Sequence, residues 1–237
     1  MDEKQLYDRQ HGEGKLISRS SFPLLRRVFR RLDLRRDDLA VSFLDGGGAL
    51  LDVGGGGGEL LIKAYGKYGR LYGIDVSETR IKQARERTAS LSGRDKPVFS
   101  VCNTNGGLDF PDASLDAVTS IAVLEHVFDL YFVVSEINRV LKKGGVFVAQ
   151  VPNIAYIKQR VTLLLGILPV TSSPYNWKEI GWDGGHLHYF TKKTFCGLLE
   201  DGGFKIEKVS GTGLFAGLRN FYPALLTGDI CVKAVKK

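Results

Sequence analysis

Short apolar runs alternate with amphipathic stretches along most of the chain. Seven runs rich in β-branched and aliphatic residues predict strands at 49–53, 70–75, 97–102, 115–121, 145–151, 204–210 and 229–235. Apolar residues that recur every three or four positions predict helices between them, among others at 78–91, 130–142 and 192–201. Strands that alternate with helices are typical of a parallel sheet with both faces covered. The pattern therefore predicts an α/β fold with a doubly wound sheet.

The positive charge of the chain is concentrated in residues 15–36. This segment holds eight lysines and arginines against one acid, Asp33, and it accounts for the whole net charge of +7. Four apolar residues recur there at helical spacing: Phe22, Leu25, Phe29 and Leu32. We expect residues 1–40 to form a basic amphipathic helical cap on a main domain of residues 41–237. A solvated basic face is the simplest interpretation, and an anionic substrate, partner or membrane surface, or RNA, remains an alternative.

Composition favours one full-sized domain in a reducing compartment. A chain of 237 residues with 43% hydrophobic content can bury one α/β core but is too short for two large domains. The three cysteines, Cys102, Cys196 and Cys231, are odd in number and widely separated, which argues against disulfides and against zinc. The N-terminus lacks an apolar signal core, and the longest apolar stretch, 161–170, is about half a bilayer span. We expect a cytoplasmic protein without a transmembrane segment.

A run of five glycines, Gly54 to Gly58, directly follows an apolar strand that ends in Asp52 and Val53. Residues without side chains let the backbone come close to a bulky ligand. Asp75 ends the next strand, where a carboxylate is placed to hold ribose hydroxyls. The run lacks the third glycine of the dinucleotide fingerprint, and no Gly-Lys-Ser/Thr follows for a phosphate loop. The pattern indicates a nucleoside cofactor without a phosphate, of which S-adenosylmethionine is an example.

Further short segments follow this loop in a fixed order, so that the complete set lies at 50–58, 73–77, 110–118, 124–127, 136–145 and 151–153. Together they resemble the motifs of class I S-adenosylmethionine-dependent methyltransferases of the type 11/23 branch, over roughly residues 45 to 210. Parts of the segment 152–191 are similar to the methionine-biosynthesis W protein group and to sugar- or polyketide-associated methyltransferases. The resemblance implies a Rossmann-like, seven-stranded, mostly parallel sheet with an antiparallel edge hairpin and helices on both faces. It also implies S-adenosylmethionine as cofactor and S-adenosylhomocysteine as product.

Ligands of open α/β sheets bind outside the carboxyl ends of the strands. The candidate cofactor residues therefore follow the first three strands of the core, and they are Asp52, Gly54, Gly55, Gly56, Gly58, Asp75, Val76, Asn103 and Thr104. We expect Asp52 and the glycines beside the methionine part, Asp75 at the ribose, and Asn103 with Thr104 beside the adenine. An ordinary acid near a helix N-cap is the alternative for Asp75, because Ser77 starts a helix. The family usually has Cys and Thr in place of Gly55 and Gly57, where small residues suffice, and often an acid in place of Asn103.

A sulfonium methyl group is already activated, so its transfer depends mainly on positioning, and a base is needed only for a protonated acceptor. Glu125 and His126 follow the fourth strand, and with His188 they are the candidate catalytic residues. Helix capping or simple site lining is the alternative for them. His186 and His188 have an H-x-H spacing that suits a metal, but no further Cys or His is close in sequence, so we expect no metal.

The segment 152–191 inserts about 40 residues after the fifth strand, which is typical of a lid or binding element. Its candidate substrate residues are Asn153, Tyr156, Trp182, His186 and Tyr189. A second apolar loop, 213–228, is expected to contribute to the lid or to a dimer contact.

The sequence thus predicts an enzyme that transfers a methyl group from S-adenosylmethionine to a small molecule by in-line displacement, with an oxygen, nitrogen or carbon atom as acceptor. A regulatory partner of a biosynthetic enzyme that binds S-adenosylmethionine is the first alternative, because of the W-protein similarity. An RNA methyltransferase is the second, disfavoured because the charge is confined to one segment. We expect no DNA partner, and a homodimer and a complex with a biosynthetic enzyme both stay open.

Overall fold

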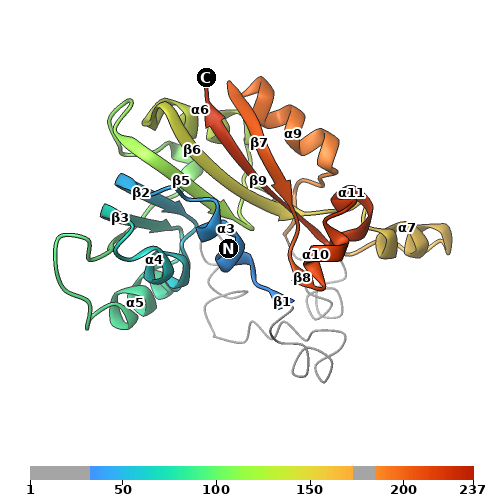
Figure 1. Cartoon of the computed structure of the whole chain (residues 1–237), viewed down its shortest axis with the longest axis horizontal. Helices are drawn as coiled ribbons and strands as arrows, with labels where there is room; N and C mark the ends of the chain where they lie inside the picture. The colour runs from blue at the N-terminus through green and yellow to red at the C-terminus, as the bar shows by residue number, and fades with distance from the viewer. Residues whose placement is uncertain (1–32, 173–184) are drawn as a thin grey trace.

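The computed structural model describes residues 33–172 and 185–237, and its centre is a seven-stranded sheet (Figure 1). The strand order is β4-β3-β2-β5-β6-β9-β7. The bounds are β2 (Gly47–Val53), β3 (Tyr68–Asp75), β4 (Val98–Val101), β5 (Leu115–Ile121), β6 (Leu141–Pro152), β7 (Phe204–Ser210) and β9 (Asp229–Lys236). All seven predicted strands are confirmed, with ends that differ by a few residues.

The sheet is parallel from β4 to β6 and antiparallel at its other edge. β2 pairs in parallel with β3 and β5, β3 with β4, and β5 with β6. β9 runs antiparallel to both of its neighbours, β6 and β7, and β7 is joined to the sheet through β9 (Figure 1). The Rossmann-like fold and the antiparallel edge hairpin are therefore confirmed.

Helices cover both faces of the sheet, because alternate residues of each central strand point to opposite sides. On one side α3 (Arg36–Ser42), α4 (Glu59–Ala64) and α5 (Glu78–Arg87) pack around Leu50 and Leu71. On the other side α6 (Leu130–Val140) and α9 (Lys192–Asp201) pack around Leu51 and Phe147. The result is a three-layer α/β/α domain.

The helix starts follow from their capping residues. The Ser77 hydroxyl accepts from Arg80 N at the start of α5, and the Asp129 carboxylate accepts from Phe132 N at the start of α6. Thr191 and Thr194 form a reciprocal capping box at α9. α9 has its predicted bounds, whereas α5 and α6 end earlier than predicted, since turn residues follow Arg87 and β6 already begins at Leu141.

Several short elements complete the described residues. They are η2 (Thr104–Gly106), α7 (Ile157–Leu164), α10 (Ala216–Arg219), α11 (Pro223–Leu226), and a two-residue antiparallel ladder between β1 (Asp33–Leu34) and β8 (Gly213–Leu214). The predicted amphipathic helix falls within residues 1–32 and lies outside the described residues. Residues 33–40 form β1 and the start of α3, where Leu39 and Ala40 are buried in the core.

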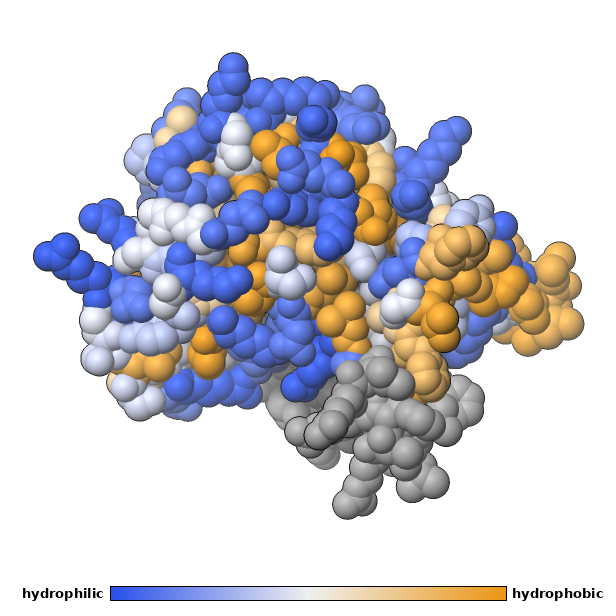
Figure 2. Space-filling model, in the orientation of Figure 1, coloured by the Kyte–Doolittle hydropathy of each residue, from blue (hydrophilic) through white to orange (hydrophobic). Residues whose placement is uncertain are grey.

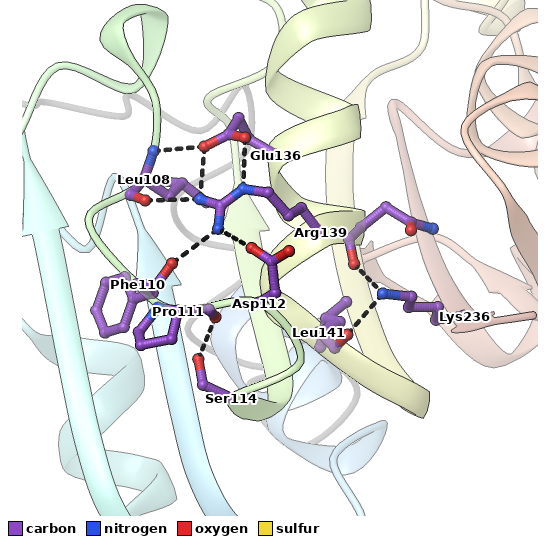
Figure 3. A network of polar contacts seen from close by, with 10 residues as sticks. Leu108, Phe110, Pro111, Asp112, Ser114, Glu136, Arg139, Leu141 and Lys236 are labelled. Carbon is purple, nitrogen blue, oxygen red and sulfur yellow. Dashed lines mark hydrogen bonds and ion pairs between the residues drawn. The ribbon is translucent and has the colours of Figure 1, made fainter.

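One arginine ties the loop before β5 to α6 (Figure 3). The Arg139 guanidinium donates to Leu108 O at 2.8 Å and to Phe110 O at 2.9 Å, and it pairs with Glu136 and Asp112. Glu136 also accepts from Leu108 N at 2.9 Å. Hydrogen bonds from Arg139 are the main reason why the pKa of Glu136 falls to about 2. This network, together with the burial of Leu108 in the core, fixes the loop before β5.

The α7 end of the molecule exposes apolar side chains. Leu163, Leu164 and Leu165 are 61%, 86% and 71% exposed, and Figure 2 shows apolar surface gathered over α7. Across residues 33–172 and 185–237, no helix has both the length and the apolar character needed to cross a bilayer.

Candidate functional site

The register of the central strands brings three loops together at the carboxyl-terminal end of these strands. Val53, the last residue of β2, lies opposite Ile74 on β3 and Ser120 on β5. Because these strands are parallel, the segments that follow them leave the sheet side by side. The glycine run, Asp75 with Ser77, and the loop 122–127 therefore surround one end of the sheet, as predicted for a ligand site.

The glycine run turns through left-handed conformations at alternate residues. The φ angles of Gly54, Gly56 and Gly58 are +70°, +49° and +79°, which favour glycine. A Cβ on Gly54 would also lie 2.2 Å from Cγ2 of Val123. Gly55 and Gly57 have no positive φ, which agrees with the expectation that other small residues suffice there. The backbone thus needs glycine at three of the five positions.

Asp75 links this loop to the start of α5. Asp75 as a whole is 3% exposed, and its Oδ2 accepts from Gly56 N at 3.0 Å and its Oδ1 from Ser77 N at 2.9 Å. The N-cap of α5 is Ser77 rather than Asp75. A carboxylate oxygen can accept more than one hydrogen bond, so Asp75 suits a partner with two hydroxyls as well as its own backbone donors. The loop and this acid fit an adenosyl group, and the ribose role stays a prediction.

Asp52 lies under the loop in the interior. It is 3% exposed, and the Thr119 hydroxyl donates to its Oδ1 at 2.6 Å. Burial raises the pKa of Asp52 to about 7, although the Thr119 bond acts in the opposite direction. Its Oδ2 lies 3.1 Å from where a Cβ of Gly55 would be. Sequence reasoning missed Thr119, because its position opposite Asp52 depends on the register between β2 and β5.

The loop after β4 contains the residues predicted beside the adenine. The side-chain oxygen of Asn103 accepts from the backbone N and from Nδ2 of Asn105, at 3.0 and 3.1 Å, and so caps η2 at Thr104. Asn105 Oδ1 in turn accepts from Phe128 N at 2.9 Å, which joins this loop to the one after β5. Val76 is half-buried directly after Asp75. Contacts of Asn103, Thr104 and Val76 with a cofactor stay predictions.

The loop after β5 is held in an unusual conformation. Ala122 has a φ of +58°, which is uncommon for a residue other than glycine. Its N–H donates to Gln150 O at 2.9 Å, and the Glu125 carbonyl accepts from Leu187 N at 2.8 Å and His188 N at 3.2 Å. The loop is therefore anchored on one side to β6 and on the other to the segment 185–188.

This docking brings Glu125, His126 and His186 together, with one potential ligand atom of each within 4.8 Å of the others. The ring centroids of His126 and His186 are 4.6 Å apart and nearly perpendicular. His126 Nδ1 lies 3.1 Å from Gly185 O, and His186 Nδ1 lies 2.7 Å from the Thr171 hydroxyl. Glu125 is 1% exposed, and burial raises its pKa to about 8. We call these three residues the Glu-His-His cluster.

The two histidines of the H-x-H spacing have different surroundings. His186 belongs to the Glu-His-His cluster, whereas His188 Nε2 donates to Val127 O at 2.9 Å. Sequence reasoning missed Thr171, and a single threonine far from Glu125 in the chain carries no local signal. Of the predicted catalytic residues, Glu125 and His126 therefore lie in the cluster, whereas His188 lies outside it.

The predicted substrate residues have mixed surroundings. Asn153 is 1% exposed and uses its side chain for Ala224 O, Thr227 O and Ala155 N at 3.1, 2.9 and 3.0 Å. It therefore anchors the chain after β6 to residues 224–227. The Tyr156 ring lies 5.3 Å from the Arg219 guanidinium, and Tyr189 is 49% exposed. Trp182 lies outside the described residues, and acceptor contacts of the others stay predictions.

Residues 51–149 match the family model of a methyltransferase domain of type 11. The chain is 31% identical over 149 residues to a probable S-adenosylmethionine-dependent methyltransferase of Mycolicibacterium smegmatis, which covers 63% of this chain and 49% of the relative. It is 35% identical over 103 residues to the 27-O-demethylrifamycin SV methyltransferase of Amycolatopsis mediterranei, covering 43% of this chain and 38% of the relative. The matches thus span about half of these relatives or less.

The crystal structure of magnesium protoporphyrin IX methyltransferase from Synechocystis with bound S-adenosylhomocysteine has the same fold. Its TM-score is 0.64 at 16% identity, over 98% of this chain and 94% of that chain. This likeness shows the fold, and the family match agrees with the glycine loop and Asp75 described above. Residues 51–149 therefore carry the match to a methyltransferase domain of the type 11 family, and this match and the relatives named above support S-adenosylmethionine as the cofactor.

Proposed function

We propose that the protein transfers a methyl group from S-adenosylmethionine to a small-molecule acceptor. The observation that carries the proposal is the hydrogen bond between Gly56 N and the buried Asp75 carboxylate, in a domain of the methyltransferase family. It joins the glycine turn and the acid into one cradle at the carboxyl ends of the strands. The relatives named for rifamycin and for magnesium protoporphyrin IX support a small-molecule acceptor.

In this proposal different residues of the cradle contact different parts of the cofactor. Asp75 accepts the ribose hydroxyls, Asp52 and the glycines lie by the methionine part, and the loop at Asn103 lies by the adenine. Bound S-adenosylmethionine supplies a methyl group that is already activated by its sulfonium. The remaining task of the protein is to align the acceptor and exclude water, and positioning of this kind contributes about 7 to 11 kcal/mol to such reactions.

The acceptor side is assigned to the loop 122–127. Glu125 and His126 sit there on a backbone held by β6 and by the segment 185–188. Gly185 O can only accept, so the neutral His126 ring carries its proton on Nδ1 and its lone pair on Nε2. An acceptor that is protonated at neutral pH needs a group that removes its proton or makes the proton easier to lose. We assign this task to the Glu-His-His cluster.

The test is incubation of the full chain with methyl-labelled S-adenosylmethionine and a metabolite extract, alongside calorimetry with S-adenosylhomocysteine. We expect the protein to bind S-adenosylhomocysteine and to produce a labelled small molecule. Binding without any labelled product would favour the regulatory partner instead. Label in RNA, with binding that weakens steeply with salt, would favour an RNA methyltransferase.

A further inference from the structure

The Glu-His-His cluster combines ligands from two distant parts of the chain. Glu125 and His126 come from the loop after β5, whereas His186 comes from the segment that docks on that loop through Leu187 N and His188 N. One potential ligand atom of each lies within 4.8 Å of the others. The backbone contacts hold the two segments together, so the cluster is built by the fold.

Both histidines have the outer contacts that metal ligands usually have. A histidine bound to a metal commonly bonds a carbonyl, carboxylate or water through its second nitrogen, which fixes the tautomer and the ring orientation. Here Nδ1 of His126 bonds the Gly185 carbonyl, and Nδ1 of His186 bonds the Thr171 hydroxyl. The Gly185 carbonyl only accepts, so Nδ1 of His126 carries the proton and Nε2 is its ligand atom; the tautomer of His186 that donates from Nδ1 to the Thr171 hydroxyl offers Nε2 in the same way.

Glu125 supplies a second, independent observation. Its side chain is 1% exposed, and within the part of the chain that the structure describes, Oε2 has no hydrogen-bond partner. Burial of a carboxylate oxygen without a partner is costly. A cation beside it removes that cost.

We propose that Glu125, His126 and His186 bind a divalent first-row transition ion, Zn²⁺. Two imidazoles and one carboxylate suit zinc, and three protein ligands leave a fourth position for water or for an acceptor group. Tetrahedral zinc with ligand distances of about 2.0 to 2.2 Å places its ligands roughly 3.4 Å apart, so the three side chains move closer together on binding.

The use of this ion rests on the proposed methyl transfer, whereas its binding does not. A hydroxyl acceptor bound at the fourth position would lose its proton to solvent water more readily, because the ion would stabilise the oxyanion. The bound ion would then be the means by which the Glu-His-His cluster lowers the acceptor's hold on its proton.

The test is a metal titration of the full chain after treatment with a chelator. We expect one Zn²⁺ per chain, a higher melting temperature with the ion, and visible absorption bands from Co²⁺ in a low-symmetry site. Glu125→Gln and His186→Ala should abolish this binding, and Thr171→Val should weaken it by about 10- to 100-fold. His188→Ala is the matched control, because His188 lies in the same segment but bonds Val127 O, and it should keep full metal affinity.

Absence of saturable binding, or equal binding by wild type and His186→Ala, would overturn the metal site. If Glu125→Gln does not fold, the comparison of His186→Ala with His188→Ala decides the question. Calorimetry with S-adenosylhomocysteine on the same samples separates the two proposals. Cofactor binding without metal binding overturns the ion alone, and metal binding without cofactor binding overturns the methyltransferase proposal alone.

Discussion

Replacing Asp75 with alanine tests the ribose contact directly. Its two oxygens each accept one buried backbone N–H, at 2.9 and 3.0 Å, and the proposal adds the two ribose hydroxyls. Asp75→Ala removes a charged acceptor, which is worth about 1.5 to 3 kcal/mol of binding free energy. At about 1.4 kcal/mol per tenfold change, the Kd for S-adenosylhomocysteine should rise about 10- to 150-fold. Isothermal titration calorimetry at 25 °C measures the change.

The same substitution also affects folding, because it leaves the buried Gly56 N–H without its acceptor. That loss costs about 1 to 3 kcal/mol in free energy of unfolding. Asp116→Ala is the matched control. Asp116 accepts from Ala49 N at 2.8 Å and pairs with Lys142, but it lies near the start of β5, at the opposite end of the sheet from the cradle.

Asp116→Ala should therefore lose stability without losing affinity for S-adenosylhomocysteine. A folded Asp75→Ala protein that binds as tightly as wild type would refute the ribose assignment. An equal loss of affinity in both variants would mean that general destabilisation, and not the ribose contact, explains the effect.

Three further predictions test the site and its surroundings. Gly54→Ala should lower the free energy of unfolding by at least roughly 1 to 2 kcal/mol, because alanine is strained in a left-handed backbone and its Cβ would also meet Val123. Gly55→Ala should lower it by less, and equal losses for the two variants in urea unfolding would contradict this. Burial raises the pKa of Asp52 from 3.8 to about 7, so the folded state holds its proton more tightly and stability should fall as pH rises from about 4 through 7. Asp52→Asn should flatten that dependence in unfolding at pH 5 and 8, and an unchanged slope would disprove the raised pKa. Arg139→Lys should cost about 1 to 3 kcal/mol, because lysine cannot reproduce the forked contacts, and an unchanged melting temperature would count against it.

The sheet was predictable because its strands are buried on both faces. Buried parallel strands appear as short continuous apolar runs, and helix starts such as Ser77 and Thr191 carry their own capping signal. The glycine run and Asp75 were also readable, since both follow strands directly. The β1–β8 ladder was not, because a pair of two-residue strands leaves no periodicity to detect.

The acceptor side was only partly predictable. Sequence spacing treated His186 and His188 as a pair, whereas long-range packing places His186 against Glu125 and turns His188 to Val127 O. The role of Asn153 was also not predictable, because its side chain donates to Ala224 O and Thr227 O, which lie far along the chain. Contacts of this kind depend on how loops dock, and no local pattern in the sequence encodes docking.

The position of β9 has a consequence for the order of assembly. β7 comes earlier in the chain than β9, yet it meets the sheet by pairing with β9, which itself pairs with β6. During synthesis β7 therefore emerges before it has any template, and it must wait until β9 has joined β6. A premature stop before Asp229 would thus cost the protein two strands at once and leave β6 as a bare edge, open to pairing with other chains.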